Sequence, residues 1–185
     1  MSRPETFISI DIEASGPSPS TGSMIAIGAC LVTDPEVGFY REIRPLPGMP
    51  WDSAAERVHR LTPAHLKEHG LEPPQAMLDL DGWLQEVASG RHAVFVGFNA
   101  AFDWMFVADY FHRFLGRNPF GISALDLKGL YMGRHALERW DATRFSEVRR
   151  TYPTRRQLTH HALDDARAQA ELAQLLFGSA QVTPG

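Results

Sequence analysis

The first apolar stretch of the chain, residues 7–16, carries two acids on one side of a predicted strand. Its sequence is Phe-Ile-Ser-Ile-Asp-Ile-Glu-Ala-Ser-Gly. Because strand side chains alternate between two faces, the three isoleucines point one way, and Asp11 and Glu13 point the other way with Phe7 and Ser9. Burying such neighbouring carboxylates unpaired costs several kcal/mol each. Either this strand ends in water, or a hard divalent cation with oxygen ligands holds the two acids.

Composition is that of an ordinary globular protein. The chain has 185 residues, of which 44% are hydrophobic and 22% are charged, so we expect one domain over residues 1–185 with a core at about 6–178. There is no apolar run long enough for a membrane helix, and the start shows no signal-peptide core. Cys30 is the single cysteine, so no internal disulfide can form and a cytoplasmic location is expected.

The net charge of −4 argues at first against a nucleic-acid partner. A cluster of metal-binding acids, however, adds to the negative count, and bound metal cancels much of it. An enzyme that grips only a chain end also needs few phosphate contacts. The overall charge therefore does not exclude a nucleic-acid partner.

Periodicity predicts an α/β protein. Alternating and apolar runs predict five strands, at residues 7–16, 24–32, 38–44, 93–97 and 122–127. Helical spacing and capping residues predict helices at residues 53–59, from 63, at 73–88, from about 100 to 115, from 128 and at 161–177. The order implies a mixed five-stranded sheet, with three antiparallel strands and then parallel strands, flanked by helices.

A second acid, Asp103, lies one turn into the helix that follows the strand at 93–97. Asn99 is a candidate cap for this helix. A strand, turn and helix of this kind place the helix N-terminus at the edge of the sheet, where ligands usually bind. The plain alternative is that Asp103 only gains from the helix dipole.

A third acidic island is His160-His161-Ala-Leu-Asp164-Asp165. The two aspartates differ by one helical step, so they face about 100° apart and at most one meets the other acids easily. Arg167 is three residues after Asp164, which favours a surface ion pair there. Asp165 is therefore the better candidate ligand.

Taken together, these blocks resemble the three exonuclease motifs of the DEDDh family, which includes polymerase proofreading subunits, RNase T and oligoribonuclease. The first motif resembles Asp11-Ile-Glu13-Ala-Ser15-Gly16, and the second resembles Asn99-Ala-Ala-Phe102-Asp103. The third resembles His160 to Asp165-Ala166. The resemblance extends from Ile8 to about Phe177, and implies a ribonuclease H-like fold. One departure is Phe98, where many relatives carry a small residue or histidine.

The resemblance implies metal-dependent hydrolysis of phosphodiesters from a 3′ end, with release of 5′-mononucleotides. It implies that Asp11, Glu13, Asp103 and Asp165 hold two Mg²⁺ or Mn²⁺ ions. Two such ions stabilise both the attacking and the leaving oxygen of an in-line displacement. The resemblance implies that His160 is the general base. On one regular helix His160 and Asp165 would face about 140° apart, so His160 is expected on the loop before the last helix. A solvent-exposed residue is the plain alternative for His160, and His161 is its competitor for the role.

Further residues are candidates for binding the substrate. Ser15 and Gly16 bring backbone amides close to a terminal sugar, or form a plain turn. Phe98, Phe102 and His59 are candidates for stacking on bases, worth about 1–3 kcal/mol per base, although Phe102 fits the core better. Asn99 completes the candidate set. The arginine pairs at 149–150 and 155–156 either track phosphates or form a solvated loop.

Three functions are compatible with the sequence. The first is a 3′→5′ exonuclease acting on single-stranded DNA or RNA ends, with the choice of nucleic acid left open. The second is a non-catalytic nucleic-acid-binding module on the same fold. The third is a small-molecule α/β enzyme, which lacks support because no Gly-rich phosphate loop is present. Analogy with RNA-processing relatives also implies a homodimer.

Overall fold

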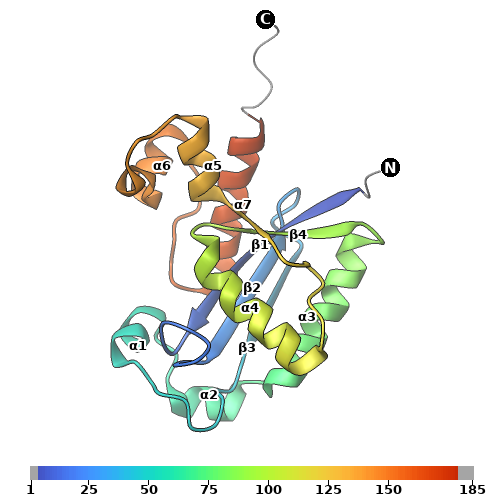
Figure 1. Cartoon of the computed structure of the whole chain (residues 1–185). Coiled ribbons are helices and arrows are strands. Elements are labelled where there is room, and N and C mark those ends of the chain that lie inside the picture. Colours follow the sequence, from blue (N-terminus) through green and yellow to red (C-terminus); the bar gives the residue numbers. More distant parts are fainter. Residues whose placement is uncertain (1–3, 179–185) are drawn as a thin grey trace, which may run out of the picture.

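Five strands form one mixed sheet at the centre of residues 4–178, the part of the chain that the computed structural model describes (Figure 1). The strands are β1 (Glu5–Ala14), β2 (Met24–Leu31), β3 (Gly38–Glu42), β4 (His92–Gly97) and β5 (Ala124–Asp126). Their order is β3-β2-β1-β4-β5. The first three are antiparallel, and β4 and β5 continue the sheet in parallel, so the predicted mixed sheet is confirmed.

Helices cover both faces of this sheet. They are α1 (Ser53–His59), α2 (Pro63–His69), α3 (Pro73–Ala88), α4 (Ala100–Leu115), α5 (Leu127–Arg134), a 3-10 helix η1 (Trp140–Thr143), α6 (Phe145–Thr151) and α7 (Ala162–Gly178). Helices α3 and α4 pack on one face, and α7 lies along β1 and β2 on the other. Short polar side chains cap the N-termini of several helices. The carboxylate of Asp126, for example, accepts the amides of Lys128 and Gly129 at the start of α5.

The alternation predicted for the first strand is present in β1. Ile8, Ile10 and Ile12 belong to the core beneath α3 and α4. On the opposite face, the Ser9 hydroxyl donates to the carbonyl of Ala166 at 2.8 Å. The residues of β1 with odd numbers therefore face α7, and this places Asp11 and Glu13 beside that helix.

Gly28 of β2 allows α7 to approach the sheet closely. A Cβ atom at this position would lie 2.2 Å from the backbone of Ala162 and Leu163, at the start of α7. Gly28 is the register partner of Asp11. The glycine therefore sets how near the first turn of α7 comes to the acids on β1.

Some local predictions were wrong. The strand predicted at 122–127 is shorter, and Ile122 is 95% exposed. Arg149 and Arg150, for which a solvated loop was one interpretation, lie in α6, and the Pro-containing loop predicted between the two arginine pairs follows that helix. Asn99 occupies the N-cap position of α4, but its φ is 66° and its side chain makes no capping bond.

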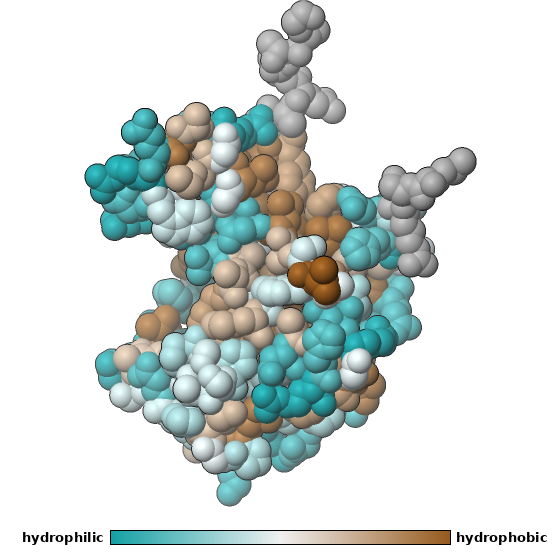
Figure 2. All heavy atoms as spheres, viewed as in Figure 1, coloured by the Kyte–Doolittle hydropathy of each residue, from teal (hydrophilic) through white to brown (hydrophobic). Residues whose placement is uncertain are grey.

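The described chain has a hollowed outline. Figure 2 shows an indentation between the protruding part that contains α5 and α6 and the part that contains α1 and α2. None of the helices within residues 4–178 has the length and apolar character needed to cross a membrane. The ends of the domain predicted over residues 1–185 lie outside the described residues.

Candidate active site

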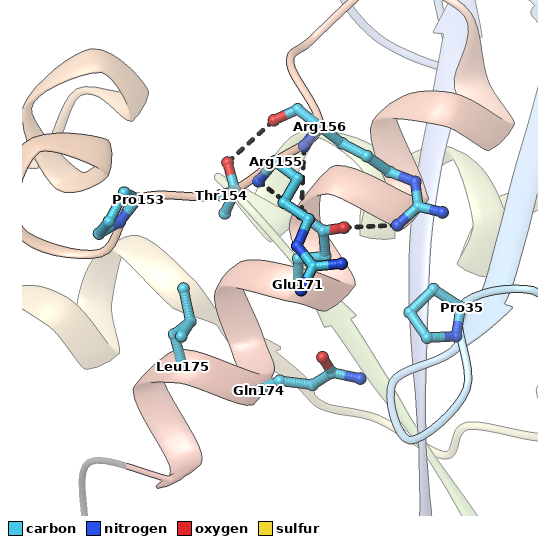
Figure 3. Close-up of a pocket in the computed structure, with 8 residues that line it drawn as sticks. All are labelled: Pro35, Pro153, Thr154, Arg155, Arg156, Glu171, Gln174 and Leu175. Atoms are coloured by element: carbon cyan, nitrogen blue, oxygen red, sulfur yellow. Dashed lines mark hydrogen bonds and ion pairs between the residues drawn. The ribbon is translucent and has the colours of Figure 1, made fainter.

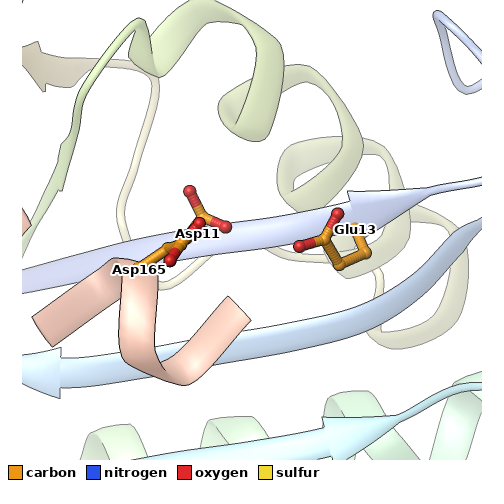
Figure 4. A group of neighbouring side chains, drawn as sticks. All are labelled: Asp11, Glu13 and Asp165. Atoms are coloured by element: carbon orange, nitrogen blue, oxygen red, sulfur yellow. The ribbon is translucent and has the colours of Figure 1, made fainter. Parts of the chain in front are cut away.

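Three of the four predicted metal ligands meet beside α7. Asp11 and Glu13 come from β1 and Asp165 comes from the first turn of α7, and each offers an oxygen within 4.8 Å of the others. Figure 4 shows Asp165 close to Asp11, with Glu13 further along the same strand. We call these three side chains the acid cluster. Their oxygen ligands are of the kind that hard divalent cations prefer.

Asp103 lies next to the acid cluster without belonging to it. Its carboxylate accepts a hydrogen bond of 3.0 Å from the backbone amide of Ile12, the residue between the two acids of β1. Only 5% of Asp103 is exposed. The predicted fourth ligand is thus held at the edge of the cluster by the strand itself.

Three carboxyl groups of this region, those of Asp11, Glu13 and Asp103, have raised pKa values. Burial, followed by the charges of Asp103, Glu13 and Asp165, raises the pKa of Asp11 well above its ordinary value. Burial and the same kind of repulsion raise the pKa of Glu13 to about 8. Burial raises the pKa of Asp103 to about 7, against the lowering effect of the Ile12 amide. Such raised pKa values mean that the site needs protons or cations to be stable.

Gln169 connects the acid cluster to the end of β4, and the sequence interpretation missed it. Its amide nitrogen donates to Asp11 at 2.6 Å, and its amide oxygen accepts the backbone amide of Phe98 at 2.9 Å. The side chain is 2% exposed. Gln169 follows Asp165 by four residues and so lies on the same face of α7. That spacing is the one signal in the sequence that indicates its position.

Asp165 also organises the segment that precedes α7. Its two carboxylate oxygens accept the backbone amides of Thr159, at 2.6 Å, and His160, at 3.1 Å. His160 has a left-handed φ of 61° and is exposed. Its position on the segment before α7 is the one that helical geometry predicted. Within residues 4–178, the His160 imidazole has no hydrogen bond or ion pair.

His161, by contrast, is engaged elsewhere. Its ring stacks on Tyr40 with centroids 4.4 Å apart, and its Nδ1 lies 3.5 Å from Asp164. Asp164 also pairs with Arg167 at 3.7 Å, the surface pair that the spacing predicted. The two adjacent histidines are therefore different: one is held on the outside of α7, and the other is free.

Ser15 and Gly16 shape the loop after β1. Ser15 is 1% exposed, and its hydroxyl accepts the amide of Ser23 at 2.9 Å and donates to the carbonyl of Pro50 at 3.3 Å. A Cβ atom on Gly16 would lie 2.6 Å from the carbonyl oxygen of Thr21. The Ser15 hydroxyl is thus used inside the fold, and Gly16 permits the loop to close on itself.

His59 ends α1 as a buried imidazole. Burial lowers its pKa. Its Nδ1 accepts the amide of Leu61 at 3.0 Å, so the proton of the neutral ring lies on Nε2. This Nε2 is buried and has no hydrogen-bond partner among residues 4–178. The ring meets Trp51 edge to face, which leaves a donor rather than an open stacking face.

Phe98 and Asn99 form the corner between β4 and α4. Phe98 is half-buried and packs edge to face on Phe145, with centroids 5.0 Å apart. The Asn99 side chain is exposed. Phe102 packs against the main core, which is the interpretation that the sequence favoured over stacking on a base.

One arginine of each pair attaches the segment before α7 to the rest of the fold. Arg149 donates to Thr154 at 2.9 Å, and Arg156 pairs with Glu36 and with Glu171, the latter at 2.5 Å. In Figure 3, the Glu171 carboxylate accepts hydrogen bonds from Arg155 and Arg156 at one side of a pocket of about 290 Å³. The pocket lies on the outer side of α7, away from the acid cluster. These contacts fix the chain that leads to His160.

A family model and a curated relative that match this chain are both described as 3′-5′ exonucleases. Residues 6–177 match the family model described as the 3′-5′ exoribonuclease Rv2179c-like domain. The Escherichia coli protein named 3′-5′ DNA exonuclease Cap18 is 43% identical over 174 residues, which cover 93% of this chain and 91% of that protein.

Solved structures share the fold at low sequence identity. The nuclease domain of 3′hExo, a DEDDh family member bound to rAMP, superposes with a TM-score of 0.77 at 14% identity, over 94% of this chain and 92% of that one. E. coli exonuclease I in complex with an oligonucleotide gives a TM-score of 0.72 at 18% identity, over 92% of this chain. This chain spans 40% of that exonuclease I chain.

Proposed function

Because the chain belongs to the family of Rv2179c-like 3′-5′ exoribonuclease domains, it is a 3′-5′ exonuclease, and we propose that it removes 5′-mononucleotides from single-stranded ends at the acid cluster. The DEDDh resemblance is thereby confirmed. The observation that carries the proposal is the meeting of Asp11 and Glu13 with Asp165, from opposite ends of the sequence. Acids that share a buried site in this way require positive charge.

Family membership implies dependence on divalent metal, and the acid cluster fits it. We assign Asp11, Glu13 and Asp165 as ligands, with Asp103 as the fourth carboxylate, for two Mg²⁺ or Mn²⁺ ions. Bound cations would neutralise these acids and stabilise the negative charge that develops on the phosphodiester oxygens. Gln169 orients Asp11 by its hydrogen bond of 2.6 Å, and the Ile12 amide orients Asp103.

His160 is the general base in this proposal. A base must be free to accept a proton from the attacking water and must lie near the ligands. Its backbone amide is tied to Asp165, whereas its ring is exposed. His161 is less suited because its ring is stacked on Tyr40.

The terminal nucleotide is held by residues around the acid cluster. We assign the exposed Asn99 amide and the Phe98 ring as direct contacts. His59, whose Nε2 is buried, supports the site from within the fold. Ser15 and Gly16 contribute by fixing the loop after β1, since the Ser15 hydroxyl already has two partners. A non-catalytic binding module would not need a group of buried acids whose mutual repulsion destabilises the fold.

Matched DNA and RNA oligonucleotides test the proposal. The matching family is described by exoribonuclease activity and the Escherichia coli relative by DNA exonuclease activity, so both substrates belong in the experiment. A 5′-labelled single strand with Mg²⁺ or Mn²⁺ should yield a ladder of products shortened from the 3′ end, and EDTA should abolish it. An intact strand under every metal condition would overturn the proposal, and the ratio of the two rates identifies the preferred nucleic acid.

Two further expectations remain predictions for this chain. Sedimentation velocity would test the homodimer that analogy implies. A cytoplasmic location would be tested by fractionating cells that produce the protein.

A further inference from the structure

Positive charge is concentrated in one part of this acidic protein. Residues 127–156, which form α5, η1 and α6 and which we call the basic lobe, contain eight Lys and Arg against three Asp and Glu, a net charge of +5. The whole chain has a net charge of −4. Such segregation produces a local positive field that attracts polyanions.

Some cations of the basic lobe are free to act on a ligand. Arg139 and Arg150 are paired with Asp141 and Glu147. Lys128, Arg144 and Arg155, on the other hand, have no carboxylate within ion-pair distance among residues 4–178. The positive charge of the lobe is therefore only partly neutralised by the protein itself.

Aromatic rings interleave with the free lysine. The Lys128 ammonium lies 4.4 Å from the centroid of the Trp140 ring and 5.9 Å from that of Phe98. Phe98 in turn packs on Phe145. Trp140 remains 51% exposed. We call Phe98, Lys128, Trp140 and Phe145 the aromatic–lysine row.

One end of the aromatic–lysine row is attached to the acid cluster. The amide of Phe98 is bound by Gln169, and Gln169 also binds Asp11. The row therefore leads from an exposed tryptophan on the basic lobe to a residue two hydrogen bonds away from a proposed metal ligand. Alternation of stacking rings and cations is the arrangement by which proteins hold single strands without reading their sequence.

From this arrangement we propose that the outer part of the aromatic–lysine row, Lys128 and Trp140, binds nucleotides beyond the first one on the 5′ side of the scissile bond, so that the enzyme prefers strands of several nucleotides to very short ones. The inference rests on the proposed exonuclease function and adds a binding surface outside the acid cluster. Trp140 stacks on a base, while Lys128 neutralises a neighbouring phosphate. The indentation beside the lobe in Figure 2 leaves space for a strand.

Rates on a series of oligonucleotides test this inference. The series runs from a dinucleotide to strands of about 20 nucleotides, beyond the ~4–16 that a single-strand site covers. The unchanged protein should show a kcat/KM that rises with length and then levels off. Trp140→Ala and Lys128→Ala should each lower kcat/KM on long strands about fivefold, as expected for one lost stacking or phosphate contact, and should leave the dinucleotide rate unchanged. Trp140→Phe should retain most of the effect.

Matched controls separate binding from folding. Leu78→Ala removes a side chain of α3 that is 53% exposed, and Lys67→Ala removes an exposed charge from α2; both should behave as the unchanged protein. Equal loss at every length, or a wild-type rate independent of length, would overturn the inference while leaving the exonuclease intact. Absence of cleavage at all lengths would instead overturn the proposed function.

Discussion

The acid cluster and the basic lobe meet at Phe98 but are built in different ways. The acids project from the central strand and from α7, and the Gln169 side chain and the Ile12 amide that bind two of them belong to buried residues. The basic lobe consists of short helices and carries an exposed tryptophan. Catalytic groups need fixed geometry, whereas a surface for a variable strand needs charge and stacking area. Changes in the two regions should therefore differ in size and in the substrate on which they act.

The largest effect is expected at the acid cluster itself. Asp11→Asn keeps an oxygen that accepts the Gln169 hydrogen bond but removes a negative charge. Loss of one cation ligand should lower kcat about a thousandfold, because metal catalysis supplies several kcal/mol. The variant should also melt no lower than the unchanged protein without metal, since repulsion from Glu13 and Asp165 is relieved. A grossly unfolded variant would show that Asp11 is structural.

The next test separates two adjacent histidines. His160→Ala should reduce kcat about a hundredfold if the imidazole is the general base. His161→Ala is the matched control, because it removes the same ring from a position stacked on Tyr40, and its kcat should remain within about twofold. The rates are measured at saturating metal and with a long strand. Comparable losses in both variants would refute the assignment of the base.

Local patterns determined how much of the site could be predicted. The alternation along β1 was sufficient to place Asp11 and Glu13 on one face, and helical spacing chose Asp165 over Asp164. The same spacing puts Gln169 on the face of Asp165, but it could not predict the contact with Asp11, which is 158 residues distant in sequence and is reached only through the packing of α7 at Gly28. The Ile12 amide that holds Asp103 was missed for the same reason.

The basic lobe was harder to predict than the sheet. Helix α6 has seven residues and begins without a side-chain capping bond, so its sequence carries neither a long period nor a start signal. Just before the lobe, the strand predicted at 122–127 begins with Ile122, an apolar residue that is exposed. Short elements that are stabilised by tertiary contacts show little periodicity and few capping signals in the sequence. Charge counting detects the lobe more readily than periodicity does.

Gln169 offers a smaller and more selective perturbation. Gln169→Leu removes the donor to Asp11 and the acceptor for Phe98, so kcat should fall about tenfold, as when a group that orients a ligand is lost. Gln174→Leu is the control, since it removes a hydrogen bond from the same helix to the carbonyl of Val32. Gln169→Leu should lose more thermal stability than the control, because it removes two hydrogen bonds of a buried side chain, whereas Gln174→Leu removes one of an exposed side chain. Only Gln169→Leu should also weaken activation by Mn²⁺; an equal loss of activity in both would show that the bridge merely stabilises α7.

The smallest effect is a coupling between pH and metal in thermal melts. Burial and neighbouring acids raise the pKa of Glu13 to about 8 and that of Asp103 to about 7. In an unfolded chain both carboxyl groups have a pKa of about 4. The folded state therefore binds more protons between these limits, and the metal-free protein should lose stability as the pH rises from 6 towards 8. Cations then replace the departing protons, so saturating Mn²⁺ should raise Tm by about 5 °C at pH 8 and by less at pH 6. Glu13→Gln should reduce the difference, because a carboxyl group that titrates in this range is gone. A metal shift independent of pH would mean that the cation binds away from these acids, and the contrast between the acid cluster and the basic lobe would then lose its chemical basis.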